Sequence, residues 1–316
     1  MDAWVPGAEL LADMSWGLVE RTVLHLATDQ GEVTVKASPP QDRHTAREIA
    51  AHRAWLAPLV AEGHVPRLLH ADQAARILVA EHLPGELVLG HPAQSEPGTF
   101  AQAGRILRLL HGQARGVDAG YGQQLRETTL RWLSRPHRIE PSTARELHRR
   151  VSAWPDQGAE MVPTHQDFQP RNWLVDEARV RLIDFGGMEL APALVDLVRL
   201  HRQDFQDDPR LEQAFLAGYG SDPRRDELWP RQLLAQAVST AVWPSAWATR
   251  PSSSRATGWS RSVWTASSEH PGRLRGKFGT PIDPKVPHNL PGMPYGPRNR
   301  PLGGPGIPRR APMAMP

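Results

Sequence analysis

The sequence predicts an α+β protein with two lobes and a C-terminal tail. Up to residue 83, short alternating or β-branched segments separated by turn residues indicate a small β-rich lobe with one main helix. From 84 to 243, longer segments with helical spacing indicate a helical lobe. Residues 244–316 hold 14 of the 31 prolines and nine of the 26 glycines without a period, which is typical of disorder.

Composition and charge exclude several classes of protein. The chain has no cysteine, so disulfides and thiolate metal sites are excluded. No apolar run approaches the roughly 18 residues of a membrane span, and the N-terminus has no signal-peptide pattern, so we expect a cytoplasmic protein without a membrane partner. The tail carries 11 Lys and Arg against two acidic residues, while the rest of the chain is mildly acidic. A positive tail alone is weak evidence for nucleic-acid binding.

The first lobe is expected to contain a hairpin, a helix and two further strands. The hairpin joins Leu18–Thr28 and Glu32–Ala37 through a turn at Asp29–Gly31. The helix covers Thr45–Glu62 and begins with capping-box spacing. The strands are Arg67–His70 and Arg76–Glu81, and the turn Leu83–Gly85 joins the lobes.

The second lobe is expected to be mainly helical around one pair of short strands. The helical segments are Thr99–His111, Gln124–Leu133, Thr143–Ala153, Ala193–Phe205, Arg210–Tyr219 and Asp226–Trp243. The strands are Asn172–Val175 and Val180–Ile183, which flank a turn at Asp176–Ala178.

The stretch THQDFQPRNWLVDEARVRLIDFGG, residues 164–187, carries the chemistry. Asp184 follows an apolar run and precedes two glycines, so its carboxylate can face a cleft and bind Mg²⁺. The side-chain oxygen of Asn172 can complete the same metal shell. Asp167 lies five residues before Asn172 and can take a proton from a substrate hydroxyl. Phosphoryl transfer requires this combination of a base and a metal clamp, together with a cation on the phosphates.

The order and spacing of these residues match two kinase signatures. The first is His165-x-Asp167-x-x-x-x-Asn172, and the second is Asp184-Phe-Gly twelve residues later. Upstream, Lys36 lies in a predicted strand and Glu48 in the helix that follows it. The chain resembles the aminoglycoside phosphotransferase family, the small-molecule branch of the protein-kinase-like fold. The short gap between the signatures and the lack of an Ala-Pro-Glu segment favour this branch over protein kinases.

The resemblance implies a role for each matching position. The catalytic base would be Asp167, the Mg²⁺ ligands Asn172 and Asp184, the phosphate-binding pair Lys36 and Glu48, the adenine-binding hinge Glu81, His82 and Leu83, and the structural supports His165 and Asp196. The donor would be ATP or GTP. The acceptor would be a small-molecule hydroxyl, of the aminoglycoside-antibiotic type.

Several alternatives stay open. An edge-strand lysine is an ordinary position for Lys36, and Glu48 is also explained by the capping box. A metabolic kinase of the choline, homoserine or sugar type would carry the same motifs. A nucleotide-binding protein inactivated by its altered C-terminus would keep them too, and a tail that binds nucleic acid is the remotest alternative.

Three features depart from the family pattern. The segment Ser15-Trp16-Gly17 has one glycine where protein kinases have three, and Gln166 stands where relatives commonly have Gly. A side chain at 166 either crowds the substrate or has no effect. The last predicted helix stops in mid-pattern at Pro244. The residues that follow have a permitted coding that reads as a helix-forming peptide after a shift of one base, so we hypothesise a frameshifted end that would leave the acceptor pocket incomplete.

Overall fold

The computed structural model describes residues 4–15, 20–224 and 227–247, with side chains to residue 242. Within these ranges, no helix combines the length and apolarity that a membrane crossing requires. The glycine-poor loop at 16–17 lies outside the described residues, and so do the predictions of disorder and of a frameshift for 248–316.

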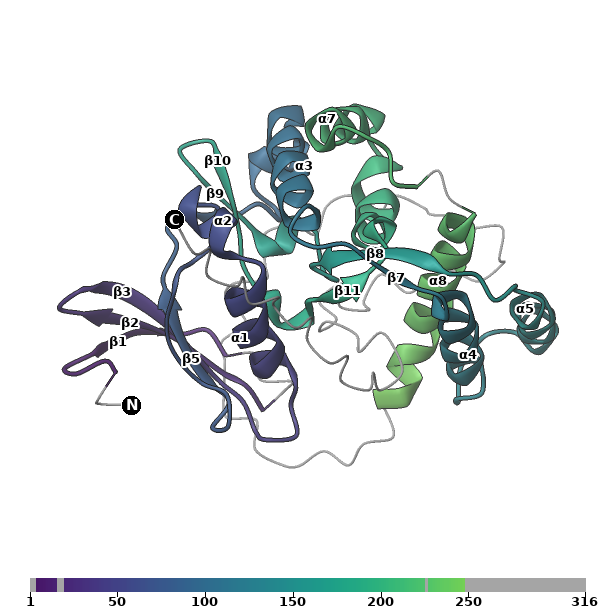
Figure 1. Cartoon of the computed structure of the whole chain (residues 1–316), viewed down its shortest axis with the longest axis horizontal. Coiled ribbons are helices and arrows are strands. Elements are labelled where there is room, and N and C mark those ends of the chain that lie inside the picture. The colour runs from purple at the N-terminus through teal and green to yellow at the C-terminus, as the bar shows by residue number, and fades with distance from the viewer. Residues whose placement is uncertain (1–3, 16–19, 225–226, 248–316) are drawn as a thin grey trace, which may run out of the picture.

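The first lobe is built on a five-stranded antiparallel sheet in the order β1-β2-β3-β5-β4 (Figure 1). Its strands are β1 Glu9–Asp13, β2 Thr22–Thr28, β3 Gly31–Ala37, β4 Leu68–Asp72 and β5 Ile77–Glu81. The predicted hairpin is present as β2 and β3. Strand β1 was not predicted, because its two leucines are consecutive and exposed and so give no alternation.

The single helix predicted for this lobe is two helices. They are α1, His44–Ala54, and α2, Ala57–Ala61. Pro58 lies in the first turn of α2. Proline has no N–H and its ring clashes with the carbonyl four residues earlier, so the continuous helix expected over 45–62 is interrupted there.

The two faces of the sheet have different partners. Val33, Val35 and Val79 pack with Val5 on one face. Leu78 and Ala80 pack against Ile49 of α1 on the other face. Side chains alternate along a strand, and Lys36 pairs with Leu78, so Lys36 also points to the α1 face.

The second lobe contains six α-helices within the described residues, and α3 packs along α7 (Figure 1). The helices are α3 Pro97–His111, α4 Tyr121–Leu133, α5 Pro141–Ser152, α6 Leu197–Leu200, α7 Pro209–Tyr219 and α8 Leu228–Trp247. Two small sheets accompany them, in the orders β10-β9-β6 and β11-β8-β7. Their strands are β6 Glu86–Leu87, β7 Gly116–Asp118, β8 Ala159–Thr164, β9 Trp173–Asp176, β10 Arg179–Leu182 and β11 Glu189–Ala191.

Two helix predictions need correction. Helix α8 does not stop at Trp243 but runs through Pro244 to Trp247. The φ angle of proline is compatible with a helix, so the helix continues at the cost of one hydrogen bond. The predicted helix 193–205 is a 3₁₀ turn, α6 and a π turn over His201–Phe205. The π turn brings Phe205, like Leu200, into the core, although residues five apart face different sides of an α-helix.

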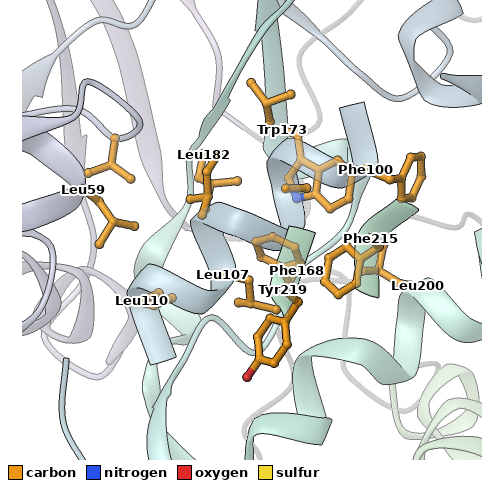
Figure 2. Packing of buried hydrophobic residues seen from close by; sticks show 14 of the residues in the cluster. Leu59, Phe100, Leu107, Leu110, Phe168, Trp173, Leu182, Leu200, Phe215 and Tyr219 are labelled. Carbon is orange, nitrogen blue, oxygen red and sulfur yellow. The ribbon is translucent and has the colours of Figure 1, made fainter. Parts of the chain in front are cut away.

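An aromatic core lies directly beneath the loop that joins β8 to β9. Phe168 packs against Trp173 and Phe215, with ring centroids 5.1 and 6.2 Å apart, and Phe100 contacts Trp173 at 5.3 Å (Figure 2). Phe168 and Trp173 are at most 1% exposed. Because Phe168 anchors the middle of the loop and Trp173 its end, residues 169–172 between them are held in fixed positions, and Asp167 directly precedes the buried Phe168.

Candidate active site

The β8–β9 loop brings Asp167 and Asn172 into direct contact. The side-chain Nδ2 of Asn172 donates to the backbone oxygen and to Oδ2 of Asp167, each at 2.8 Å. The residues are 3% and 6% exposed. Because the side-chain nitrogen of Asn172 is bonded to Asp167, the side-chain oxygen of Asn172 remains as the atom that can bind a ligand.

Two arginines also bind the Asp167 carboxylate. Arg171 pairs with Oδ2, and Arg199 Nη1 lies 3.2 Å from Oδ1. Gln169 donates to Oδ1 as well. The sequence interpretation missed these residues, although Arg171 directly precedes Asn172 and Arg199 lies three residues after Asp196. The contacts fix the orientation of the carboxylate through strong charge-assisted bonds.

Asp184 lies beside Asn172 in a strained backbone conformation. The N–H of Ile183 donates to the Asn172 carbonyl at 3.0 Å, which places the next residue, Asp184, next to the Asn172 loop. Asp184 has φ +65° and ψ +73°. A non-glycine residue in this region costs about 1–3 kcal/mol, and such strain is concentrated at functional sites.

The charges around Asp184 keep its carboxylate ionised. Neighbouring protein atoms desolvate the carboxylate of this otherwise exposed residue and raise its pKa, but Lys36, His44, His165 and Arg171 outweigh this effect and lower the pKa to about 2. The carboxylate is therefore anionic at every physiological pH.

Gly186 allows α1 to pack on the loop that Asp184 begins. A Cβ on Gly186 would lie 2.6 Å from Nδ1 of His44, the first residue of α1. Glycine is therefore required for this close approach. The same helix carries Glu48, so the packing sets the position of Glu48 relative to Asp184.

Lys36 and Glu48 form a partly buried ion pair between β3 and α1. Lys36 Nζ donates to Glu48 Oε1 at 2.7 Å, with side chains 21% and 6% exposed. Burial lowers the pKa of Lys36, but the charges of Glu48 and Asp184 raise it above its usual value. The amine is thus cationic and interacts electrostatically with Asp184. The predicted site residues of the first lobe therefore lie close to those of the second.

The oxygen atoms of Asn172 and Asp184 fit Mg²⁺. Mg²⁺ prefers hard oxygen donors and is bound in phosphoryl-transfer sites by one or two carboxylates plus substrate phosphates. Asp184 supplies an ionised carboxylate. Asn172 supplies its side-chain oxygen, since its side-chain nitrogen is already bonded to Asp167.

His165 and Asp196 lie behind the loop and not on its cleft side. Asp196 accepts the backbone N–H groups of His165 and Gln166 at 2.8 and 2.6 Å. It also contacts His111 Nε2 at 3.1 Å, and His111 Nδ1 contacts the Tyr219 hydroxyl at 2.8 Å. This network ties the loop to α3 and α7. His165 Nε2 binds the carbonyl of Ile183 at 3.1 Å, which links the loop to the Asp184 segment.

Gln166 adopts a backbone conformation that favours glycine, with φ +68°. This explains why glycine suits the position. Its side chain is 7% exposed, and its amide nitrogen donates to Thr164 Oγ1 at 2.7 Å. The side chain is therefore folded back on β8.

The segment Glu81–Leu83 joins the two lobes, but the Glu81 side chain lies away from Lys36. Glu81 pairs with Val33 in the sheet, so it shares the face opposite to Lys36. Its carboxylate binds Arg67, with Nε–Oε1 2.9 Å. His82 donates its backbone N–H to the Glu32 carbonyl at 3.0 Å. Leu83 is half-buried.

The carboxylate of Glu189, on the strand that pairs with β8, predicts a pH effect on stability. Burial raises the pKa of Glu189, and Arg47 at 3.5 Å only partly offsets this, so the pKa is about 7 against 4.5 for the free group. The native state therefore prefers the neutral form. The contribution of the neutral Glu189 to the free energy of unfolding is complete below pH 4.5 and is lost as the pH rises through 7. We expect Glu189→Gln to raise the Tm at pH 8 and to leave it unchanged at pH 5, measured by thermal unfolding.

Glu160→Gln is the matched control, since Glu160 lies on the neighbouring strand β8 and its side chain is 60% exposed. It should leave the pH dependence of the Tm as in the parent protein. A Glu189→Gln variant with the parent pH profile would contradict the assignment.

A β-sheet lobe with a Lys–Glu pair beside an Asp–Asn loop and an Asp-Phe-Gly loop defines a kinase-type phosphotransferase. The chain belongs to the phosphotransferase enzyme family (APH), whose sequence profile matches residues 14–229. The resemblance inferred from the motifs is confirmed. Comparison with curated protein sequences gives no match.

Solved structures with similar folds include three antibiotic phosphotransferases. Macrolide 2'-phosphotransferase MphH from Brachybacterium faecium aligns with a TM-score of 0.54 at 17% identity, covering 78% of this chain and 92% of that one. Spectinomycin phosphotransferase APH(9)-Ia, in complex with ADP and spectinomycin, gives 0.52 at 15% identity, covering 78% and 84%. A thermostable mutant of APH(4)-Ia gives 0.53 at 13% identity, covering 76% and 90%. At these identities the similarity shows the fold, and the predicted two-lobe kinase-like fold is confirmed.

Proposed function

We propose that this protein transfers the γ-phosphoryl group of ATP or GTP to a hydroxyl group of a small molecule, an antibiotic of the aminoglycoside type. The observation that carries the proposal is that Asp167, Asn172 and Asp184 converge on the Lys36–Glu48 ion pair. Lys36 Nζ and Glu48 Oε1 in this pair are 2.7 Å apart. Each residue type matches one requirement of phosphoryl transfer: a base, a metal clamp and a phosphate-binding cation.

The proposed reaction forms one P–O bond and breaks another. The acceptor oxygen attacks the γ-phosphorus, the bond to the β–γ bridging oxygen breaks, and the nucleoside diphosphate leaves. Asp167 orients the hydroxyl and takes its proton, which then passes to solvent. Arg171 and Arg199 hold the Asp167 carboxylate in place. Mg²⁺, held by Asn172 and Asp184, would neutralise phosphate charge.

The nucleotide would lie between the Lys36 face of the sheet and the Asp184 loop. Glu48 orients Lys36 toward the α and β phosphates, and the backbone of Glu81–Leu83 lines the adenine pocket. His165 and Asp196 support the catalytic loop from behind. Because the donor is a nucleoside triphosphate, the proposed activity belongs to the cytoplasm.

The fold neighbours support an antibiotic acceptor. Three neighbours with TM-scores above 0.5 are named as a macrolide, a spectinomycin and an aminoglycoside phosphotransferase. A panel of these antibiotics with Mg-ATP or Mg-GTP, scored by nucleoside-diphosphate release, tests the proposal. Release that depends on one acceptor supports it. Release with none of the panel, at full nucleotide binding, contradicts the antibiotic acceptor.

A metabolic kinase is the second candidate, and the charges at Asp167 favour it. Two guanidinium groups lie on this single carboxylate, so Asp167, Arg171 and Arg199 together carry one positive charge. A polycationic acceptor would be repelled there, whereas a neutral sugar-type hydroxyl would not. Adding neutral sugars and choline to the same panel separates the two acceptor classes. Bound nucleotide without any transfer would indicate the inactive alternative.

Lys36→Met provides a test of the nucleotide site. We expect nucleotide affinity to fall about 10–100-fold, because a charge-assisted phosphate contact contributes about 1.5–3 kcal/mol. Titration with a fluorescent ATP analogue measures it. Arg53→Met is the control, since Arg53 is an exposed cation on α1 that bonds Gln73 at 3.3 Å. Equal affinity in the two variants would show that Lys36 does not bind the nucleotide.

A further inference from the structure

Three side chains at the hinge end of the first-lobe sheet bring metal-binding atoms together. His25 Nε2 lies 2.7 Å from Glu32 Oε2, and the His25 ring stacks on His82 with centroids 3.5 Å apart and an interplanar angle of 10°. One ligand atom from each residue lies within 4.8 Å of the other two. Ligand atoms about 2 Å from one ion lie at most about 4 Å apart. The three atoms are therefore within about 1 Å of the spacing that a shared ion needs, and the two stacked rings would have to turn, because an imidazole binds an ion in its own ring plane. We call these residues the His–Glu–His cluster.

The sheet register explains why the cluster forms. His25 on β2 pairs with Thr34 on β3, and Thr34 pairs with Ala80 on β5. Glu32 lies two residues before Thr34, on the same face. His82 directly follows β5. Its backbone N–H donates to the Glu32 carbonyl at 3.0 Å, which brings His82 to the same place. The cluster thus lies on the Lys36 face of the sheet, at the end where β5 leads into the second lobe.

Thr34 orients one of the two imidazoles. Its Oγ1 lies 3.0 Å from His82 Nδ1, which leaves Nε2 as the other ring nitrogen. Histidine ligands of metal ions are commonly held in this way by a hydrogen bond at the opposite nitrogen, which fixes the tautomer and the ring orientation.

The electrostatic surroundings favour the form of His82 that binds metals. Burial lowers the pKa of His82, and the neighbouring His25 lowers it further, while Glu32 acts in the opposite direction. A neutral imidazole is the form that coordinates an ion. The carboxylate of Glu32 supplies the negative charge; its side chain is 57% exposed, so an ion can reach it from solvent.

We propose that His25, Glu32 and His82 bind a transition-metal ion of the Zn²⁺ class. Two imidazoles and one carboxylate form a known ligand set of zinc sites that keep an open fourth position. Mg²⁺ prefers oxygen ligands, so this site is chemically distinct from Asn172 and Asp184. The ion would fasten the β2–β3 hairpin to the segment after β5, next to the proposed adenine pocket.

Metal binding by the full-length, metal-free protein tests this inference directly. We would titrate Zn²⁺ by calorimetry and Co²⁺ by visible absorption, without nucleotide. We expect one tight equivalent of Zn²⁺, with affinity reduced at least about 10–100-fold in His25→Gln and in Glu32→Gln. Glu32→Gln changes an exposed side chain, so it tests the site without endangering the fold.

His70→Gln is the matched control. His70 is an exposed histidine on β4 of the same sheet. The chain has 14 histidines, so weak binding elsewhere is expected, and only the difference between variants is decisive. Zn²⁺ affinity equal in Glu32→Gln and His70→Gln would overturn the proposal. So would the absence of a tight equivalent in the unmodified protein.

Discussion

Asp167→Asn is expected to lower kcat by about 10²–10⁴-fold, the usual contribution of a positioned acid or base. The amide keeps nearly the same shape but cannot accept the proton of the acceptor hydroxyl. Because Asp167 lies in the loop of the second lobe and Lys36 in the first, nucleotide affinity should change little. Acceptor-dependent release of nucleoside diphosphate measures kcat, and a fluorescent nucleotide measures affinity.

Asp72→Asn is the control for this substitution. Asp72 is the last residue of β4 and accepts the N–H groups of Ala74 and Ala75 at 2.9 Å, which an asparagine oxygen also can do. It should keep the parent activity. If Asp167→Asn retains activity within a few-fold of Asp72→Asn, Asp167 is not the base.

Asp196→Ala is expected to reduce the free energy of unfolding by about 3–5 kcal/mol. The carboxylate is buried and accepts from His165 N, Gln166 N and His111 Nε2. Removing it leaves several buried donors without an acceptor, and each unsatisfied group costs about 1–3 kcal/mol. Urea unfolding followed by tryptophan fluorescence gives the value.

Two further substitutions make this prediction specific. Tyr219→Phe removes only the hydroxyl that contacts His111 Nδ1, so a loss of about 1 kcal/mol is expected. Asp72→Ala, at the end of β4, should cost about 1 kcal/mol or less. An Asp196→Ala variant as stable as Asp72→Ala would mean that the network does not hold the loop.

Much of the architecture could be predicted because local signals were strong. The β2–β3 hairpin has turn residues between alternating strands, and α3 has clear helical spacing. The spacing of Asp167, Asn172 and Asp184 led to the family, which the sequence profile confirms. The residue roles remain predictions.

The failures occurred where tertiary contacts decide the local structure. The π turn at His201–Phe205 exists because Phe205 reaches the shared core, and nothing within those five residues signals that partner. Arg199 meets Asp167 across 32 positions of sequence, so spacing rules cannot reveal the pair. The Glu81 side chain points away from Lys36 because of strand pairing, which becomes visible only with the register.

Lys36 offers a practical consequence for labelling chemistry. It is the sole lysine in the first 276 residues, and its amine is cationic because of Glu48 and Asp184. A protonated amine is a poor nucleophile, so general acylating reagents should modify it slowly. A nucleotide carrying an acyl phosphate would instead deliver its electrophile to this amine. Peptide mapping of one modified position would then report occupancy of the cleft, with little background from the folded lobes.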